Sequence, residues 1–435
     1  MLTFLGFAMV VAFMYLIMSK RMSALIALIL VPIIFALFGG FGPTIGPMML
    51  AGITKLAPTG VMLMFAILYF ALMIDSGLFD PAVRQILRWV KGDPMKVSVG
   101  TAVLALVVSL DGDGATTYMI CVAAMLPLYS RIGMSPRIMA GLIILAGGIM
   151  NMTPWGGPTA RAASALHVDA SDIFVPMIPA MCAGVVALLL IAYFYGKRER
   201  ARLGELHLHG DDADHSEISV SQFPDARRPK LIWFNGGLTL LLMVALIMGL
   251  LPLPVLFMIA FSIAMIINYP NLQDQKDRIA AHSGSVLAVV GLIFAAGIFT
   301  GILTGTGMVD AMSKSLLAVI PEAMGPYLAV ITALVSMPFT FFMSNDAFYY
   351  GVLPVLTEAA SHYGISAVEM ARASIVGQPV HLLSPLVPST YLLVALAGIE
   401  FGDHQRFTLK WAVLICLCIM VAALLMGIFP LYSSL

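Results

Sequence analysis

Long apolar segments recur along the whole chain and constrain what it can fold into. A helix that crosses a bilayer needs about 20 apolar residues, or slightly fewer. Such segments lie at 1–18, 22–38, 60–75, 171–194, 231–250, 252–268, 284–302 and 408–430. Charged residues make up only 11% of the chain and the net charge is zero, whereas soluble domains carry about a quarter charged residues. The sequence therefore predicts an all-α polytopic membrane protein, without the basic surface that binds nucleic acid.

Four further apolar segments are interrupted by polar residues. The segments 138–167 and 366–398 are each long enough to span a bilayer but carry a break, so we expect broken helices. The segments 96–130 and 325–361 each have two apolar arms around a polar centre. They suit re-entrant hairpins whose tips lie inside the protein. This interpretation gives ten crossings and two hairpins.

The positions of the basic residues test this count. If the loop 196–230 is inside, all but four of the 23 lysines and arginines fall on the inner side. The exceptions are Lys55, Arg161, Lys314 and Arg372. Basic residues concentrate in the cytoplasmic loops of membrane proteins. We therefore expect the loop 196–230 to be cytoplasmic and both termini to lie outside.

The chain also contains an internal repeat. Residues 1–195 and 231–435 match at offsets of 230 and 231, with 196–230 as the linker between them. The matched pairs are Gly77/Gly307, Asp80/Asp310, Leu87/Leu317, Gly133/Gly364, Ser135/Ser366, Met139/Met370, Ala140/Ala371 and Pro154/Pro385. Each copy has five crossings, an odd number, so the second copy enters the membrane from the opposite face. Inverted repeats of this kind are typical of secondary transporters, whose substrate site lies between the repeats.

The polar breaks are the candidate binding site. Non-helical backbone at membrane depth is tolerated only where protein or a water-filled cavity satisfies it. Each helix that starts there offers free N–H groups and a positive dipole end to an anion, although the same residue types also serve as helix caps. The candidate substrate-binding residues are Gly112, Gly114, Thr116, Asn151, Thr153, Thr159, Arg161, Ser344, Asn345, Ser384, Ser389 and Thr390.

Charged side chains in these breaks need a partner or a function, because a charge at the bilayer centre costs about 2.5–3.5 kcal/mol. Arg161 suits a substrate carboxylate. Asp111, Asp113 and Asp346 could exchange protons or ligate a divalent metal ion. A structural ion pair between Arg161 and an aspartate is the alternative. Asp75 and His381 are weaker candidates, and a satisfied buried histidine is the simpler interpretation of His381.

These motifs resemble the CitMHS family of bacterial citrate–divalent metal:proton symporters. The resemblance rests on Asp-Gly-Asp-Gly-Ala-Thr at 111–116, Asn-Met-Thr-Pro-Trp-Gly-Gly-Pro-Thr-Ala-Arg at 151–161, Ser-Asn-Asp-Ala at 344–347 and the Ser-Pro…Pro-Ser-Thr break at 384–390. It implies uptake of citrate complexed with a divalent ion such as magnesium or calcium, driven by protons, across a bacterial inner membrane. Citrate, the metal ion and protons would then be the small-molecule partners, with no tightly bound cofactor.

A more distant similarity is to the divalent anion:sodium symporters, which use Ser-Asn-Thr at both hairpin tips. Here residues 344–346 read Ser-Asn-Asp, and this difference argues against sodium coupling. The related fold implies a homodimer and an elevator-type mechanism, in which the hairpin domain moves against a scaffold.

Other functions remain open at this point. One is transport of a different dicarboxylate, tricarboxylate or organic anion, and another is a sodium/proton exchanger of the same superfamily. An anion channel is a further alternative, which could not concentrate its substrate. A membrane enzyme is disfavoured because the sequence has no zinc motif, nucleophile elbow or phosphate loop.

Overall fold

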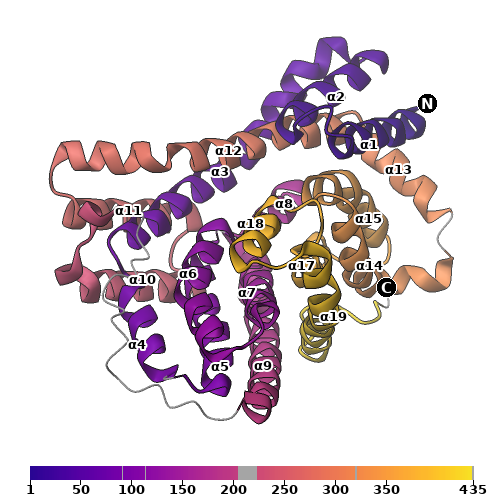
Figure 1. Cartoon of the computed structure of the whole chain (residues 1–435). Helices are drawn as coiled ribbons and strands as arrows, with labels where there is room; N and C mark the ends of the chain where they lie inside the picture. Colours follow the sequence, from indigo (N-terminus) through magenta and orange to yellow (C-terminus); the bar gives the residue numbers. More distant parts are fainter. Residues whose placement is uncertain (91, 113, 204–222, 319–320, 434–435) are drawn as a thin grey trace.

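The protein is a helical membrane protein, seen here in a computed structural model (Figure 1). The structure describes residues 1–90, 92–112, 114–203, 223–318 and 321–433, and for Met18, Asp111, Pro224 and Leu317 the backbone alone. No β-strand occurs in this part of the chain. By length and composition, seven helices in it can cross a membrane, lying within 42–75, 114–132, 170–203, 229–247, 272–305, 322–342 and 401–425. The predicted ten crossings also use shorter apolar helices, so that number stays a prediction.

Two long helices, α3 (Ile45–Asp75) and α12 (Leu272–Gly305), lie side by side across the top of the molecule (Figure 1). At 1.5 Å per residue they are about 45 and 50 Å long. Both exceed a bilayer core of about 30 Å, so each tilts or extends beyond it. Glycines allow close packing where the helices cross, because a Cβ on Gly52 would overlap the carbonyl oxygen of Gly297. Small residues at such crossings are typical of membrane helices.

We call α3 and α12 together the arm. Most of the remaining helices form a bundle below and beside it (Figure 1). The N-terminal helices are α1 (Leu2–Met18) and α2 (Ala24–Phe38), and α10 (Ile232–Ile247) and α11 (Leu253–Asn268) follow the linker. The bundle contains α4 (Asp80–Val90), α5 (Pro94–Val108), α6 (Gly114–Ile132), α7 (Pro136–Met150), α8 (Gly157–Leu166) and α9 (Ala170–Leu203). The second half contributes α13 (Met308–Leu317), α14 (Leu328–Phe342), α15 (Leu353–Ser361), α16 (Ala367–Ser374), α17 (Gln378–His381), α18 (Pro388–Ala397) and α19 (Phe401–Leu425).

Local sequence signals set several helix starts. Asp93 accepts a hydrogen bond from the Met95 N–H and is followed by Pro94 at the first helical position of α5, a favoured combination. Ser366 and Glu369 form a capping box at the start of α16. These residues fix where the arms of the hairpins and broken helices begin.

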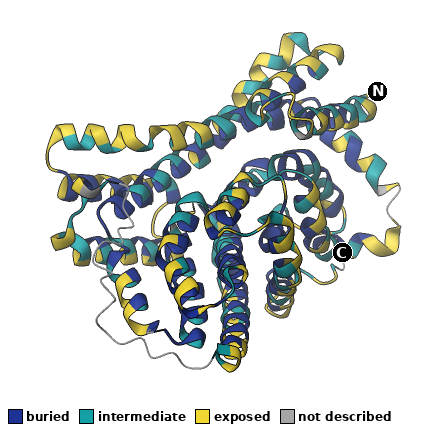
Figure 2. Ribbon diagram, viewed as in Figure 1, coloured by how far each residue is buried: buried dark blue, intermediate teal, exposed yellow. Residues whose placement is uncertain are grey.

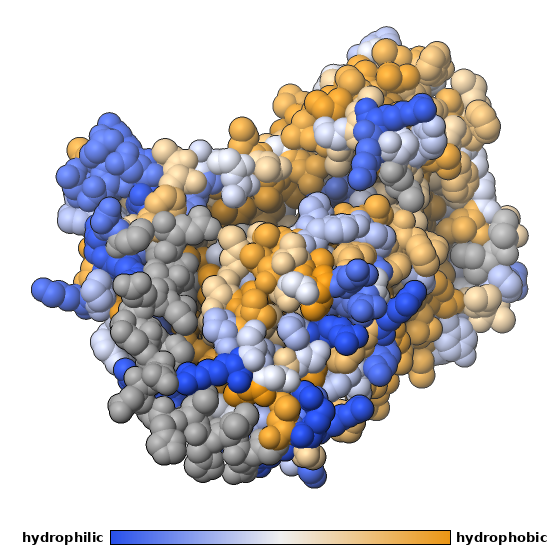
Figure 3. Space-filling view, in the orientation of Figure 1, coloured by the Kyte–Doolittle hydropathy of each residue, from blue (hydrophilic) through white to orange (hydrophobic). Residues whose placement is uncertain are grey.

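Burial follows the bundle rather than the arm (Figure 2). Buried residues concentrate where the bundle helices face one another, whereas α10 and α12 keep large exposed faces. Leu240, Leu241 and Trp233 of α10 are among the exposed apolar side chains. Hydrophobic residues cover much of the surface, and hydrophilic ones gather over the start of α12 (Figure 3). An apolar exterior of this kind suits a lipid environment.

The two halves of the chain have the same order of helices. Two N-terminal helices, a long helix, a short amphipathic helix, a hairpin, a broken segment and a final helix occur in 1–203 and again in 232–425. The inverted orientation of the repeats stays a prediction. Helix α9 continues to Leu203, so residues 196–203 of the predicted linker are helical, and residues 204–222 lie outside the described residues.

Candidate functional site

The first broken segment is interrupted between α7 and α8, and we call residues 151–156 the first break. Pro154 has no N–H to donate, and a Cβ on Gly156 would overlap the carbonyl oxygen of Asn151. The hydroxyl of Thr159, fully buried in α8, donates to the Met152 carbonyl at 3.0 Å. This bond ties the two sides of the break together.

The second broken segment is interrupted between α17 and α18, and we call residues 382–387 the second break. The buried hydroxyl of Thr390 donates across it to the Leu382 carbonyl. Ser384 donates to the Phe341 carbonyl at 2.6 Å. The His381 Nδ1 lies 2.6 Å from the Thr340 carbonyl, so His381 is a satisfied buried histidine. Both breaks are therefore closed by a threonine hydroxyl near the start of the second half-helix.

Each break is also bonded to the end of a hairpin arm. Trp155 donates its Nε1–H to the Leu110 carbonyl at 2.9 Å, next to the tip of the first hairpin, formed by α5 and α6. Its ring packs against Phe70 and Phe257, with centroid distances of 4.9 and 5.4 Å. Gly112 turns the tip with φ of 76°, a conformation that favours glycine. Ser384 makes the corresponding bond to the second hairpin, formed by α14 and α15. The breaks and hairpins thus form one connected polar centre.

A cavity of about 150 Å³, which we call the tip cavity, lies between the first hairpin and the second break. The lining residues that the structure describes come from both halves of the chain and are uncharged. They are Ser109, Gly112, Gly114, Thr117, Tyr118, Gly147, Asn151, Leu382 and Ser389. Helices α6 and α18 begin at this cavity, at Gly114 and Pro388. Their N-termini provide N–H groups and positive dipole ends to a bound anion.

Two hydroxyl groups at the tip cavity lack a partner. Ser109 is 4% exposed and Thr117 is 1% exposed. Neither side-chain oxygen has a hydrogen-bond partner among the described residues. A buried unsatisfied hydroxyl costs about 1–3 kcal/mol, and such groups call for an explanation. A polar ligand in the cavity would supply the missing hydrogen bonds.

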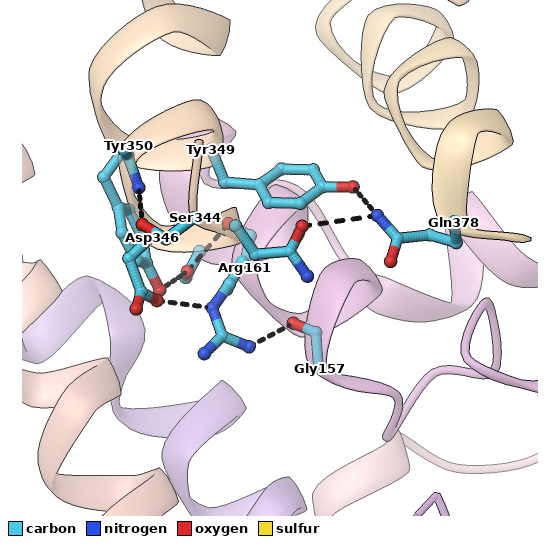
Figure 4. A network of polar contacts seen from close by, with 10 residues as sticks. Gly157, Arg161, Ser344, Asp346, Tyr349, Tyr350 and Gln378 are labelled. Carbon is cyan, nitrogen blue, oxygen red and sulfur yellow. Dashed lines mark hydrogen bonds and ion pairs between the residues drawn. The ribbon is translucent and has the colours of Figure 1, made fainter. Parts of the chain in front are cut away.

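The second hairpin carries an ion pair instead (Figure 4). The Arg161 Nε donates to Asp346 Oδ1 at 2.6 Å, and another guanidinium nitrogen donates to the Gly157 carbonyl at 3.1 Å. The two charged side chains are only 22% and 15% exposed. Asp346 directly precedes a π-helical turn, Ala347–Val352, a feature often found at functional sites. The ion pair that the sequence left as an alternative is present.

A chain of amides connects the tip cavity with this ion pair. Asn151 donates to Gln378 Oε1 at 3.2 Å. Gln378 donates in turn to the Tyr349 hydroxyl at 3.0 Å and to Asn345 Oδ1 at 3.5 Å. Asn345 directly precedes Asp346. The first break is therefore linked through Gln378 to the second hairpin.

The structure divides the predicted substrate-binding residues into groups. Gly112, Gly114, Asn151 and Ser389 line the tip cavity. The hydroxyls of Thr159, Ser384 and Thr390 bond to main-chain carbonyls, and Ser344 accepts from the Ala347 N–H at 3.2 Å. Thr153 is buried without a partner among the described residues, and Thr116 lies in α6 outside the cavity lining.

Of the three predicted metal ligands, the structure describes the side chain of Asp346 alone. Asp113 lies outside the described residues, and for Asp111 the structure describes the backbone alone. Asp346 is held by Arg161. Within the described ranges there is no group of three or more His, Cys, Asp and Glu residues placed to hold a metal ion. Metal contact by these three aspartates stays a prediction.

Sequence reasoning missed Gln378 and Tyr349, and it included Ser109 and Thr117 in the first hairpin tip without choosing them as substrate-binding residues. Thr117 had a usable signal, because residues three positions apart on a helix share a face, and Gly114 is three residues before it. For Gln378 the usable signal was a glutamine within an apolar broken segment. The structure shows that this glutamine is fully buried. Tyr349 gave no such signal, because an aromatic residue in an apolar segment reads as core.

Asp75 belongs to a different cluster, at the end of α3. Its carboxylate accepts from Arg278 at 3.1 Å and lies 2.8 Å from His282 Nε2, both on α12. Nearby, burial raises the pKa of Tyr269 to about 12, so its hydroxyl stays protonated and donates to the Ala226 carbonyl at 2.7 Å. These contacts fasten the end of the linker to the arm. Asp75 therefore bonds to α12 and not to the breaks.

A multi-pass helical protein whose polar groups meet at helix breaks between two halves of the chain belongs to the class of membrane transporters. Comparisons with known proteins refine this class. The family model of the citrate transporter CitMHS matches residues 13–377. The chain belongs to this family, and it is a transporter, not an enzyme.

Relatives from Bacillus subtilis (strain 168) match nearly the full chain. A protein named citrate transporter is 62% identical over 98% of this chain and 99% of its own length. A protein named Mg(2+)/citrate complex secondary transporter is 57% identical over the same shares. The uncharacterized transporter YraO is 51% identical, again over 98% and 99%.

Solved structures show a similar fold at low sequence identity. The YdaH transporter of Alcanivorax borkumensis has a TM-score of 0.55 and 16% identity, covering 88% of each chain. MtrF of Neisseria gonorrhoeae, described among antimetabolite efflux pumps, has a TM-score of 0.58 and 15% identity, covering 89% of this chain and 84% of its own. At these identities the likeness concerns the fold alone.

Proposed function

We propose that this protein carries citrate as a complex with a divalent metal ion of the magnesium or calcium class, in symport with protons. The observation that carries the proposal is the tip cavity, where two helix N-termini meet two buried hydroxyls that have no partner among the described residues. Neutral donors of this kind suit an anion of low charge. A divalent ion reduces the three negative charges of citrate to one, which lowers the cost of removing the substrate from water.

The names of the relatives support the same substrate. One is named for citrate and another for the magnesium–citrate complex. In this proposal the substrate lies between the tip cavity and Asn345, with one carboxylate toward Arg161. Asp111 and Asp113 at the first tip would contact the metal ion.

Proton coupling would use the ion pair. Arg161 is the counter-charge of the Asp346 carboxylate, at 2.6 Å. When a substrate carboxylate takes over the guanidinium, Asp346 loses its counter-charge in a poorly solvated site, and it then binds a proton. Substrate and proton would thus bind together.

The proposal also includes the setting of the protein. It places the chain in a bacterial inner membrane, with the loop 196–230 in the cytoplasm and both termini outside, because the basic residues follow this orientation. It includes a homodimer in which the hairpins move as an elevator, as the family resemblance implies.

Uptake of labelled citrate into proteoliposomes tests the transported species. With an inward proton gradient, we expect accumulation that stops when a non-transported chelator removes divalent ions and resumes when magnesium is added in excess. Replacing sodium with potassium should change nothing. Uptake that is indifferent to the chelator would exclude the metal complex. Equilibration without accumulation would point instead to a channel.

A further inference from the structure

Gln378 lies where the two broken segments cross. Its side chain is fully buried at the start of α17. The next residue, Pro379, approaches α7 so closely that a Cβ on Gly148 would lie 2.5 Å from its Cα. The backbone of Gln378 is therefore fixed against the first half of the chain.

The orientation of the Gln378 amide is set by a main-chain group. The Tyr349 hydroxyl donates its single proton to the Ser374 carbonyl at 3.3 Å. This hydroxyl can therefore only accept from Gln378, which requires the Nε2 amide nitrogen to face it. The Gln378 Oε1 atom then faces Asn151, which donates to it.

The orientation of the Gln378 amide also sets the orientation of Asn151 and Asn345, which bond to it. Asn151 uses its Nδ2 group on Gln378, so its Oδ1 atom is left for the tip cavity that it lines. Asn345 uses its Oδ1 atom on Gln378, so its Nδ2 group is left as a donor beside Asp346 and Arg161. One side of the centre thus offers an oxygen and the other an N–H group.

We propose that Gln378 is a positioning residue for the substrate, which turns the Asn151 oxygen toward the tip cavity and the Asn345 N–H donor toward a carboxylate. An amide oxygen suits a divalent ion or a substrate hydroxyl, whereas an N–H donor suits a carboxylate. The inference rests on the proposed function and adds the orientation of the bound substrate to it. The carboxylate of the substrate binds on the side of the second hairpin.

The substitution Gln378→Glu tests this orientation. A glutamate at 378 lacks the amide NH2 group. Ionised, it donates no hydrogen bond, and protonated, it donates one in place of the two that Gln378 gives to Tyr349 and Asn345. Asn345 therefore loses its fixed orientation, whereas Asn151 keeps an acceptor at this position. We expect KM for magnesium–citrate to rise about tenfold or more, the value of a hydrogen bond to a charged group, with Vmax within about twofold of wild type. A purely structural role would lower Vmax or protein yield and leave KM unchanged.

A double-mutant cycle with Asn345→Ala separates positioning from general damage. Asn345→Ala alone should raise KM by a similar factor, and Gln378→Glu should add little in that background. Asn345 is only half-buried, so Asn345→Ala still tests the N–H donor of the proposal if Gln378→Glu does not fold. Thr332→Val, a buried change in α14, is the matched control and should leave KM and Vmax unchanged.

The result is read against the wild type. Effects on KM that multiply, or a fall in Vmax at constant KM, would overturn the role of Gln378. If the wild type instead takes up citrate without any metal ion, the proposed metal complex fails, but the same cycle measured with free citrate still decides the role of Gln378.

Discussion

The first hairpin tip faces a cavity whose lining is uncharged as far as the structure describes it, whereas the second hairpin carries an ion pair. Both hairpins contact the broken segment of the opposite half, since α6 packs on α18 and the π-helical turn packs on α8. At the first tip, the buried hydroxyls of Ser109 and Thr117 have no partner in the part of the chain that the structure describes. At the second, Arg161 and Asp346 satisfy each other at 2.6 Å.

This difference shows that one backbone arrangement supports two kinds of chemistry. The helix starts and threonine-closed breaks are common to both sides and position the polar groups. The side chains then decide whether a side is left open for a ligand or is already paired. We infer that the substrate enters on the open side and that one of its carboxylates reaches the paired side, which responds to it.

The largest effect is expected from Arg161→Met, which leaves the mostly enclosed Asp346 carboxylate without its counter-charge. Breaking a buried pair in this way costs about 3–5 kcal/mol, so we expect lower thermal stability in detergent. Uptake should fall by more than about 100-fold. Arg161→Met combined with Asp346→Asn removes both charges and should restore stability but not transport. Recovery of uptake in the double variant would show that the pair is only structural.

A smaller and opposite effect on stability is expected at the tip cavity. Thr117→Val removes a buried hydroxyl that has no partner, so stability should stay the same or rise by up to about 1 kcal/mol. KM for the substrate should nevertheless rise about five- to tenfold, because a bound ligand loses a hydrogen bond. Thr332→Val removes another buried hydroxyl without a partner among the described residues and serves as control. An unchanged KM in Thr117→Val would exclude the tip cavity as the binding site.

The smallest effects are expected at the threonines that close the breaks. Thr159→Val and Thr390→Val each remove one hydrogen bond to a carbonyl and should each lower stability by about 1 kcal/mol. Because the two bonds are equivalent in the two halves, their effects on thermal unfolding should be similar. A large loss of transport at one position with none at the other would show that the two breaks do different work.

The sequence predicted the places where the chain is interrupted. Proline and glycine at 154–158 and proline at 385 and 388 lie where the helices end, because these residues break helices through local geometry alone. The positions of Gly112, Gly114, Asn151 and Ser389 at the cavity also followed from local polarity. Long helices were underestimated, since α3 begins at Ile45 instead of residue 60 and its first turns carry fewer strongly apolar residues.

What the sequence could not predict depends on contacts between distant segments. Arg161 and Asp346 are 185 residues apart, so their pairing could only be one alternative among several. Gln378 acts through Asn151, 227 residues away, and no local pattern reveals that contact. Thr116 was chosen in place of Thr117 because polarity was considered without the helical face.

The crossing of α3 and α12 has a consequence for how the protein can change. At Gly52 and Gly297 the obstacle to a larger residue is main chain, which cannot rotate out of the way as a side chain does. Only glycine therefore fits at position 52 without moving a helix, whereas the lipid-facing positions of the same helices can take any apolar side chain. The substitution Gly52→Ala would therefore push α3 and α12 apart without touching the substrate site.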